Sequence, residues 1–249
     1  MRFDFTGKTI IVTGATRGIG KQIADDLAEL KANLILTGTN PDEIDMLNRS
    51  AITNSTSKKY HCVNFSENES LLEFIDELKK TDRVHGLINN AGINRLNYID
   101  ETLIEDWNDM ISVNLSAPFQ LIRCVSEKMK KQSYGRIVNV ASIFSKISKE
   151  RRSVYSATKF GIHGLTVGVS NDLARHNILV NTLSPGFVLT DLTRKNLSEK
   201  EQLEMAQMIP ARRLAVTRDI SNVAIFLMSD LNQYLTGQNI VVDGGFTNI

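Results

Sequence analysis

The chain has 249 residues, 42% of them hydrophobic, and a formal net charge of +1. This near-neutral balance argues against a nucleic-acid-binding surface. The basic pairs, such as Lys130-Lys131 and Arg151-Arg152, are separated by acids along the chain and are interpreted as solvated surface charge. The length suits one α/β domain with a sizeable core, because such domains often run to about 250 residues without splitting.

The cysteines and the N-terminal residues indicate the cellular compartment of the protein. Cys62 and Cys124 are far apart, and no CxxC motif or Cys/His cluster accompanies them. A disulfide framework and a structural metal site are therefore not expected, and both thiols are predicted to be free and buried in a reducing cytosol. No stretch approaches the ~20 apolar residues of a membrane span, and no signal peptide is recognisable. We expect a cytoplasmic protein with no metal, membrane or nucleic-acid partner.

Short β-branched runs alternate with longer helical patterns throughout. Strands are predicted at residues 9–13, 33–37, 59–63, 86–89, 135–140, 179–183 and 239–242. Helices are predicted at residues 19–31, 69–80, 106–131, 152–175 and 219–230. Strands that are apolar on both faces and alternate with helices indicate a parallel sheet covered on both sides. Right-handed crossovers then give an α/β fold, a single doubly wound, Rossmann-like domain that spans residues 1–249.

A glycine-rich turn follows the first predicted strand, with the sequence Thr13-Gly14-Ala15-Thr16-Arg17-Gly18-Ile19-Gly20. Glycines let the backbone turn sharply and approach a ligand closely, and the next helix presents free N–H groups and a positive dipole end to a pyrophosphate. The spacing is GxxxGxG rather than GxGxxG. Its place after the first strand favours dinucleotide binding, and the alternative is a structural glycine turn.

The end of the second strand bears on the choice between NAD and NADP. NAD-preferring Rossmann domains usually place an acid there to hold the ribose 2′-hydroxyl. Here residues 36–40 read Leu-Thr-Gly-Thr-Asn, and Asp42 is expected in the first turn of the next helix. Arg17 can pair with a 2′-phosphate and Thr39 can add a hydroxyl donor. We favour NADP(H), and the alternative for Arg17 is a solvent-exposed loop charge.

Two further segments carry asparagines. The fourth strand ends Asn89-Asn90-Ala91-Gly92, where small residues would let the adenosine part of a cofactor lie against the sheet edge while the asparagines tie neighbouring backbone together. Asn114 interrupts an otherwise apolar helical stretch. The residues alone leave it open whether Asn114 is a buried hydrogen-bonding residue or part of a site.

The candidate chemistry lies at Ser142, Tyr155 and Lys159. Ser142 follows the fifth strand, at the edge where open α/β sheets bind ligands. Tyr155 and Lys159 are four residues apart in a predicted helix and share one face, and no other tyrosine has a lysine four residues on. A nearby ammonium lowers the pKa of a phenol from about 10, which suits proton transfer at a carbonyl or alcohol oxygen. Ser142 can hydrogen-bond the same oxygen from the other side.

A serine nucleophile is the rival interpretation of Ser142. No G-x-S-x-G elbow surrounds it, and the four histidines suggest no partner for it. We assign His163 and His176, on or beside the predicted Tyr155 helix, to packing or the surface.

Together these residues resemble the classical short-chain dehydrogenase/reductase family over essentially the whole chain. The motifs that stand in family order are the glycine turn, Asn89-Asn90-Ala91-Gly92, Asn114, Ser142, Tyr155 with Lys159, Ser184-Pro185-Gly186 with Thr190, Thr236-Gly237-Gln238 and Asp243-Gly244-Gly245. The resemblance implies that Tyr155 is the general acid or base at the substrate oxygen, and that Lys159 holds the nicotinamide ribose and lowers the tyrosine pKa. It implies that Ser142 orients the carbonyl and that Asn114 anchors a water linking Lys159 to solvent.

The resemblance also implies contact residues. Those of the cofactor are Gly14, Thr16, Arg17, Gly18, Ile19, Gly20, Thr39, Asn64, Phe65, Asn90, Ala91, Gly92, Tyr155, Lys159, Pro185, Gly186, Val188 and Thr190. Those of the substrate are Asn94, Ser142, Ile143, Phe144, Tyr155 and Phe187. Asn64 stands where the family usually has an aspartate, and an asparagine can still accept one hydrogen bond and donate another near the adenine.

Within the family, several stretches are similar to bacterial 3-oxoacyl-acyl-carrier-protein reductases. They are Asn90-Ala91-Gly92-Ile93-Asn94-Arg95, Trp107-Asn108-Asp109, Ser184-Pro185-Gly186-Phe187 and Ile209-Pro210-Ala211-Arg212-Arg213. This similarity implies NADPH-dependent reduction of a β-ketoacyl thioester on a carrier protein. In those reductases arginines meet the acidic carrier; here Ser133 and His176 stand at the matching positions, with Lys130, Lys131 and Arg175 nearby. The alternatives are a sugar, polyol or other small ketone or alcohol oxidoreductase, and a non-catalytic dinucleotide-binding protein.

The segment at residues 187–210 is rich in charge and follows the expected nicotinamide contact. This place suits a lid that closes on the substrate, and the alternative is a plain surface helix. The resemblance further implies a homotetramer built on the two long helices and the C-terminal segment. Broad apolar faces on those helices fit this arrangement, although a monomer core uses such faces equally well.

Overall fold

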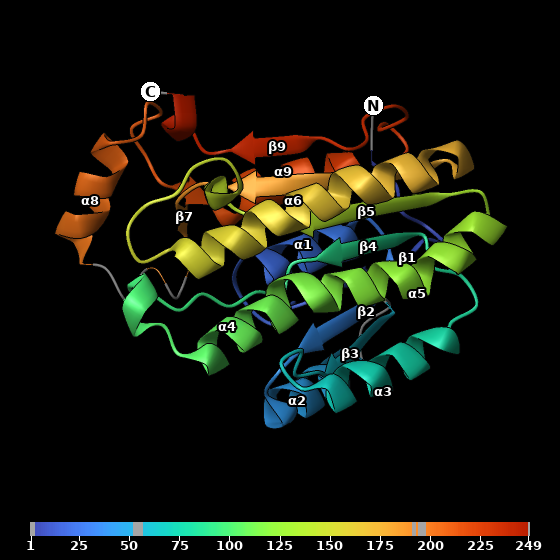
Figure 1. The fold of residues 1–249 in the computed structure, drawn as a ribbon. Coiled ribbons are helices and arrows are strands. Elements are labelled where there is room, and N and C mark those ends of the chain that lie inside the picture. Colours follow the sequence, from blue (N-terminus) through green and yellow to red (C-terminus); the bar gives the residue numbers. More distant parts are fainter. Residues whose placement is uncertain (1–2, 52–56, 191–192, 194–197, 249) are drawn as a thin grey trace.

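The protein is described by a computed structural model that covers residues 3–51, 57–190, 193 and 198–248 (Figure 1). Its main feature is a seven-stranded, all-parallel sheet in the order β3-β2-β1-β4-β5-β6-β9. The strands are β1 Thr9–Val12, β2 Asn33–Gly38, β3 Lys58–Cys62, β4 Gly86–Asn89, β5 Gly135–Val140, β6 Ile178–Pro185 and β9 Asn239–Val242. Each of the seven strands predicted from the sequence is confirmed, with ends shifted by at most a few residues.

The strand order indicates where a ligand is expected to bind. The chain runs outward from β1 through β2 to β3, then crosses back to β4 beside β1 and continues through β5 to β6. The carboxyl ends of β1 and β4 are therefore the point where the winding reverses, and open α/β sheets bind ligands at such points. The predicted glycine turn and the Asn90 segment both lie there.

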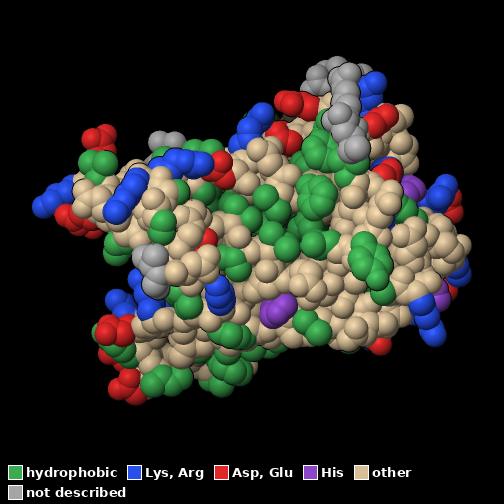
Figure 2. Space-filling view, turned by 90° about the horizontal axis from the view of Figure 1, so that it is seen from above, with side chains coloured by type: hydrophobic (Ala, Val, Ile, Leu, Met, Phe, Trp, Pro, Cys, Tyr) green, Lys and Arg blue, Asp and Glu red, His purple; other side chains and the backbone are tan. Residues whose placement is uncertain are grey.

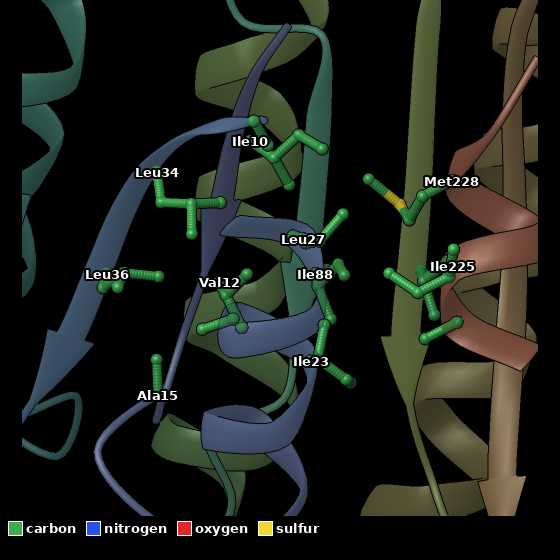
Figure 3. Close-up of a cluster of buried hydrophobic side chains, with 14 of the residues drawn as sticks. Ile10, Val12, Ala15, Ile23, Leu27, Leu34, Leu36, Ile88, Ile225 and Met228 are labelled. Carbon is green, nitrogen blue, oxygen red and sulfur yellow. The ribbon is translucent and has the colours of Figure 1, made fainter. Parts of the chain in front are cut away.

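Helices cover both faces of the sheet, because the central strands are apolar on both sides (Figure 1). They are α1 Gly18–Glu29, α2 Pro41–Ala51, α3 Asn68–Lys79, α4 Ile104–Ile111, α5 Ala117–Lys131, α6 Ser153–Leu173, α8 Glu199–Gln207 and α9 Thr217–Met228. One buried cluster joins the sheet to α1 and α9, and Figure 3 shows Ile23 and Leu27 of α1 facing Val12 and Ile88. A second buried cluster joins the opposite face to α3, α5 and α6.

Two predicted helices are subdivided. The helix predicted at residues 106–131 is α4 and α5 joined by a π-helical segment at Ser112–Ser116, which contains Asn114. The helix predicted at 152–175 is α6 followed by a 3₁₀ turn, Ala174–His176. A second sheet, β7 Val188–Leu189 with β8 Ala215–Val216, was not predicted because each strand has only two residues and shows no periodicity.

The prediction of two buried thiols is wrong. Cys62 is exposed and Cys124 is half-buried, and both are free. Cys62 ends β3, the edge strand of the sheet, where one side has no neighbouring strand to cover it. Among the described residues no helix is long and apolar enough to cross a membrane.

Candidate active site

The glycine turn is shaped to bring backbone close to a ligand. Gly14 and Gly18 have φ angles of +63° and +57°, a region that side chains other than glycine rarely adopt. A Cβ on Gly20 would lie 2.2 Å from the Gly14 carbonyl oxygen, so only glycine permits the helix to start this close to the turn. The N-terminus of α1 has no side-chain cap, which leaves N–H groups and the positive dipole end for an anion. These residues fit a dinucleotide pyrophosphate.

The end of β4 is tied to the glycine turn through Thr13. The Thr13 hydroxyl accepts hydrogen bonds from the backbone N–H groups of Asn90 and Ala91, both at 2.9 Å. The Asn90 side chain donates to the carbonyls of Thr13 and Gly14 at 2.9 and 3.0 Å. The predicted Asn90 segment thus holds the turn in place. Thr13, whose hydroxyl accepts two of these hydrogen bonds, is not among the predicted site residues.

The surroundings of β2 fit a phosphate better than a ribose diol. Arg17 and Thr39 are both exposed beside the crevice, and no acid occupies the end of β2. Asp42 lies in the first turn of α2, as expected from its charge and the helix dipole. Thr16 packs against Gly38, where an added Cβ would lie 2.4 Å from its methyl group.

Asn64 is held by its own loop. Its Oδ1 accepts hydrogen bonds from the backbone and hydroxyl of Ser66 at 3.2 and 2.8 Å, and its Nδ2 donates to Glu67 at 2.6 Å. One Nδ2 proton is left for an adenine, because an amide nitrogen carries two donors. Phe65 next to it is buried against Phe74.

Tyr155 is partly buried. Burial raises the pKa of Tyr155, although a hydrogen bond with Ser142 and the charge of Arg152 act to lower it. The predicted lowering of this pKa by Lys159 is wrong here, because desolvation outweighs the neighbouring charges. Ser142 and Tyr155 are nevertheless brought together as expected, one from the end of β5 and the other from the first turn of α6.

Lys159 lies one helical turn beyond Tyr155, with its Nζ 5.5 Å from the tyrosine ring centroid. Its Nζ donates to the carbonyl of Val140 at 3.0 Å, and burial lowers the pKa of Lys159 to about 8. No carboxylate pairs with it among the described residues. A buried ammonium held by one carbonyl retains donors for a ribose hydroxyl or a water.

Asn114 explains the π-helical segment. Its Oδ1 accepts from the Ile93 N–H at 2.9 Å, and its Nδ2 donates to the Ile93 carbonyl at 2.9 Å and to the Thr158 hydroxyl at 3.1 Å. Thr158 in turn donates to the Tyr155 carbonyl at 2.7 Å. Asn114 therefore connects the strand-four loop with the helix that carries Tyr155 and Lys159, and π-helical turns are frequent at functional sites. Both Nδ2 protons of Asn114 are thus used in structural bonds, whereas Oδ1 accepts one bond and retains a second lone pair.

The predicted nicotinamide segment follows β6. The Gly186 N–H donates to the Val242 carbonyl at 2.9 Å, and a Cβ on Gly186 would lie 2.8 Å from the Asp243 Cα. The Thr190 side chain lies opposite the glycine turn, since a Cβ on Gly18 would come within 3.6 Å of its methyl group. The two segments predicted to contact the pyrophosphate and the nicotinamide thereby lie next to each other.

The predicted substrate residues fall into two groups. Ile143 and Phe144 are buried next to Ser142, and the Phe144 ring meets the Tyr155 ring edge-on with centroids 6.0 Å apart. Phe187 instead packs edge-on against Phe246, with centroids 5.0 Å apart, and Asn94 is exposed.

One residue at this site, Arg152, was not predicted. It directly precedes α6, and its guanidinium lies 5.3 Å from the centroid of the Phe144 ring. In the sequence we had taken the pair Arg151-Arg152 as surface charge. The only available signal was its position three residues before Tyr155, which puts it close to the same face of the helix.

Comparison with known proteins agrees with this geometry. A family model described as Enoyl-(Acyl carrier protein) reductase matches residues 14–247. The 3-oxoacyl-[acyl-carrier-protein] reductase FabG of Aquifex aeolicus is 36% identical over 248 residues, which are 98% of this chain and 99% of that protein. The FabG protein of Escherichia coli is 35% identical over 242 residues, covering 97% and 98%.

Solved structures with a similar fold are named for gluconate rather than for the 3-oxoacyl substrate of the FabG proteins. A gluconate 5-dehydrogenase from Burkholderia cenocepacia, in complex with NADP and tartrate, superimposes with a TM-score of 0.91 at 30% identity, covering 100% of this chain and 98% of that one. A protein from Beutenbergia cavernae described as a gluconate 5-dehydrogenase with bound NADP gives 0.91 at 32% identity, covering 99% of each chain. The chain belongs to the short-chain dehydrogenase/reductase family and is an NAD(P)-dependent oxidoreductase that acts on CH–OH and C=O groups.

Proposed function

We propose that the protein is an NADPH-dependent carbonyl reductase whose proton donor is Tyr155. The observation that carries this proposal is the proximity of Ser142 to Tyr155 beside a buried Lys159, at the carboxyl edge of the sheet. NADPH supplies the hydride when it is bound. The protein supplies position, a proton and a dry environment.

The residues divide this work between them. Ser142 and Tyr155 both donate to the substrate oxygen, which orients the carbonyl and stabilises the negative charge that develops on it. Tyr155 then gives its proton to that oxygen. The raised pKa of Tyr155 keeps the phenol protonated and ready to act as an acid. In the reverse direction Ser142 and the charge of Arg152, which both act to lower the Tyr155 pKa, favour the phenolate that must accept the proton.

We propose NADP(H) as the preferred cofactor. Arg17 and Thr39 stand exposed at the end of β2, where an NAD-specific domain would have an acid. Two similar proteins were solved with NADP, which supports the proposal.

We propose a 3-oxoacyl thioester on acyl carrier protein as the substrate. The supporting observation is the similarity to FabG proteins over nearly the full chain. The exposed Lys130, Lys131 and Arg175, at the ends of α5 and α6, offer positive charge to an acidic carrier. The second candidate is a hydroxylated acid, favoured by the overlap with the gluconate dehydrogenases.

The predicted lid and the predicted oligomer are part of this proposal. The described part of the predicted lid, residues 187–190, 193 and 198–210, includes the helix α8. This helix begins with a capping box between Ser198 and Glu201, and residues 191–192 and 194–197 lie outside the described residues. Figure 1 shows α8 beyond the carboxyl ends of the strands, a place that suits closure over a substrate.

For self-association, we propose that α4, α5 and α6 form contacts between copies of a homotetramer in the cytoplasm. Trp107, Phe119, Phe160 and Val167 on these helices are at least 40% exposed. Figure 2 shows that hydrophobic side chains also gather across the middle of another face, bordered by charged groups. Exposed apolar areas of this kind are typical of interaction surfaces.

A substrate screen with NADPH and NADH in parallel tests the proposed function. We expect NADPH oxidation with a 3-oxoacyl thioester, faster on carrier protein than on a short pantetheine, and slower oxidation of NADH. Turnover of hydroxylated acids with no activity on thioesters would instead favour the second candidate. Cofactor binding without turnover on a broad carbonyl panel would contradict the proposal.

A further inference from the structure

Arg152 is a cation without a partner beside the reacting group. Its side chain forms no ion pair and no hydrogen bond with any residue that the structure describes, and its Nε is buried without an acceptor. A buried guanidinium N–H without an acceptor is uncommon, because it loses its water and gains nothing in return. Burial accordingly lowers the pKa of Arg152.

The position of Arg152 relates it to the substrate rather than to the cofactor. Its guanidinium lies against the ring of Phe144, and that ring meets Tyr155 edge-on. Its charge also acts on the Tyr155 phenol. The Phe144 ring thus lies between the guanidinium, 5.3 Å from its centroid, and the Tyr155 ring, whose centroid is 6.0 Å away.

A cavity of about 420 Å³ opens at this point, lined by Leu96, Lys149, Glu150, Arg151 and Arg152. Three cations face one acid in it. Arg151 is engaged differently, because it donates to the Leu96 carbonyl at 3.0 Å and lies 5.7 Å from the Tyr98 ring centroid. Arg152 is thus the cation of this cavity that is both half-buried and unpartnered, and it is the one nearest to Tyr155 along the chain.

We infer that Arg152 is a carboxylate receptor, through which the same active site also reduces small keto acids and oxidises the matching hydroxy acids. This inference rests on the proposed carbonyl reduction at Tyr155. The carbonyl carbon gains the hydride of NADPH and its oxygen gains the Tyr155 proton, so that ketone, NADPH and a proton give alcohol and NADP⁺. The carboxylate takes no part in the reaction; it pairs with the planar guanidinium and fixes the reacting carbon.

The test compares 3-oxobutanoate with its neutral ethyl ester in the wild type, Arg152→Met and Lys149→Met, the last removing the same charge from the same cavity. We expect the wild type to prefer the acid. Because Arg152 also acts on Tyr155, the ratio of acid to ester isolates the carboxylate contact: Arg152→Met should lower the ratio of kcat/KM for the acid to kcat/KM for the ester by about 10- to 100-fold, the range of one charge-assisted hydrogen-bonded pair. Arg152→Lys should restore part of the loss, and Lys149→Met should leave the ratio of acid to ester within threefold.

An equal loss for acid and ester in Arg152→Met, or a wild type that prefers the ester, would overturn the inference while leaving carbonyl reduction intact. A second readout does not depend on turnover. In calorimetric titrations of NADPH-loaded protein, which cannot oxidise an alcohol, 3-hydroxybutanoate should bind more tightly than its amide, and Arg152→Met should remove the difference. The same binding to both in the wild type would overturn the inference even if no carbonyl compound were reduced.

Discussion

The buried ammonium of Lys159 makes a prediction about stability that is independent of the substrate. Burial lowers the pKa of Lys159 from 10.5 to about 8. Below pH 8 the lysine is charged in both the folded and the unfolded protein, and the folded state bears the full desolvation penalty. Between pH 8 and 10.5 the unfolded chain binds more protons than the folded one, so stability rises with pH in this window.

The expected change in the free energy of unfolding follows from the size of the Lys159 pKa shift. Each pKa unit corresponds to about 1.36 kcal/mol, so the wild type should gain about 3 kcal/mol of unfolding free energy across the window. Lys159→Met removes the charge and nearly preserves the volume, but it loses the hydrogen bond to Val140, worth about 1 kcal/mol. At pH 7 the inactive variant should therefore be more stable than the wild type by about 2 kcal/mol.

Urea denaturation at pH 7 and at pH 10 measures this difference. The advantage of Lys159→Met should shrink by at least about 2 kcal/mol between the two values, as the wild type loses its buried charge. The exposed Lys130→Met variant controls for the removal of one charge from the chain. A stability difference between Lys159→Met and the wild type that stays constant within about 0.5 kcal/mol would show that Lys159 is not desolvated as described.

Three further predictions concern the cofactor, the fold and the site. Arg17→Ser should weaken NADP⁺ binding by about 10- to 100-fold and NAD⁺ binding by less than threefold in fluorescence titrations. The control variant Lys21→Ser removes a lysine that is paired with Asp25 and should change the affinity for neither cofactor. Asp26→Ala should lower the unfolding free energy by about 3 kcal/mol, because this buried carboxylate of α1 accepts hydrogen bonds from Arg218 and Ser221 of α9 at 3.0 and 2.6 Å. An unchanged urea midpoint would contradict this. Thr158→Val should lower both stability, by about 1–2 kcal/mol, and kcat, since Asn114 loses its link to α6; full activity would refute that link.

The main architecture follows from the sequence for a simple reason. Runs such as residues 135–140 and 179–183 are rich in β-branched and other apolar residues and are buried on both faces, as in a parallel sheet covered on both sides. The glycine turn could be placed because steric limits at Gly14 and Gly20 leave no other residue type. Tyr155 and Ser142 could be paired because helix periodicity and strand ends fix their positions.

The features that were missed depend on contacts between distant segments. The π-helical segment around Asn114 follows from its bonds to Ile93 and Thr158, which sequence periodicity does not report. The direction of the Tyr155 pKa was wrong because helix spacing reveals a neighbouring charge but not the depth of burial. Arg152 was taken for surface charge because its contact with Phe144 arises only when β5 and α6 are brought together.

The central claim is that Tyr155 donates the proton at a hydride-transfer site, and one measurement tests it most directly. Tyr155→Phe is compared with the wild type in NADPH oxidation by a 3-oxobutanoyl thioester, with NADPH affinity measured separately. We predict a loss in kcat of about 10²- to 10⁴-fold, the range for a general acid, with NADPH affinity and folding unchanged. Turnover by Tyr155→Phe within threefold of the wild type would contradict the claim.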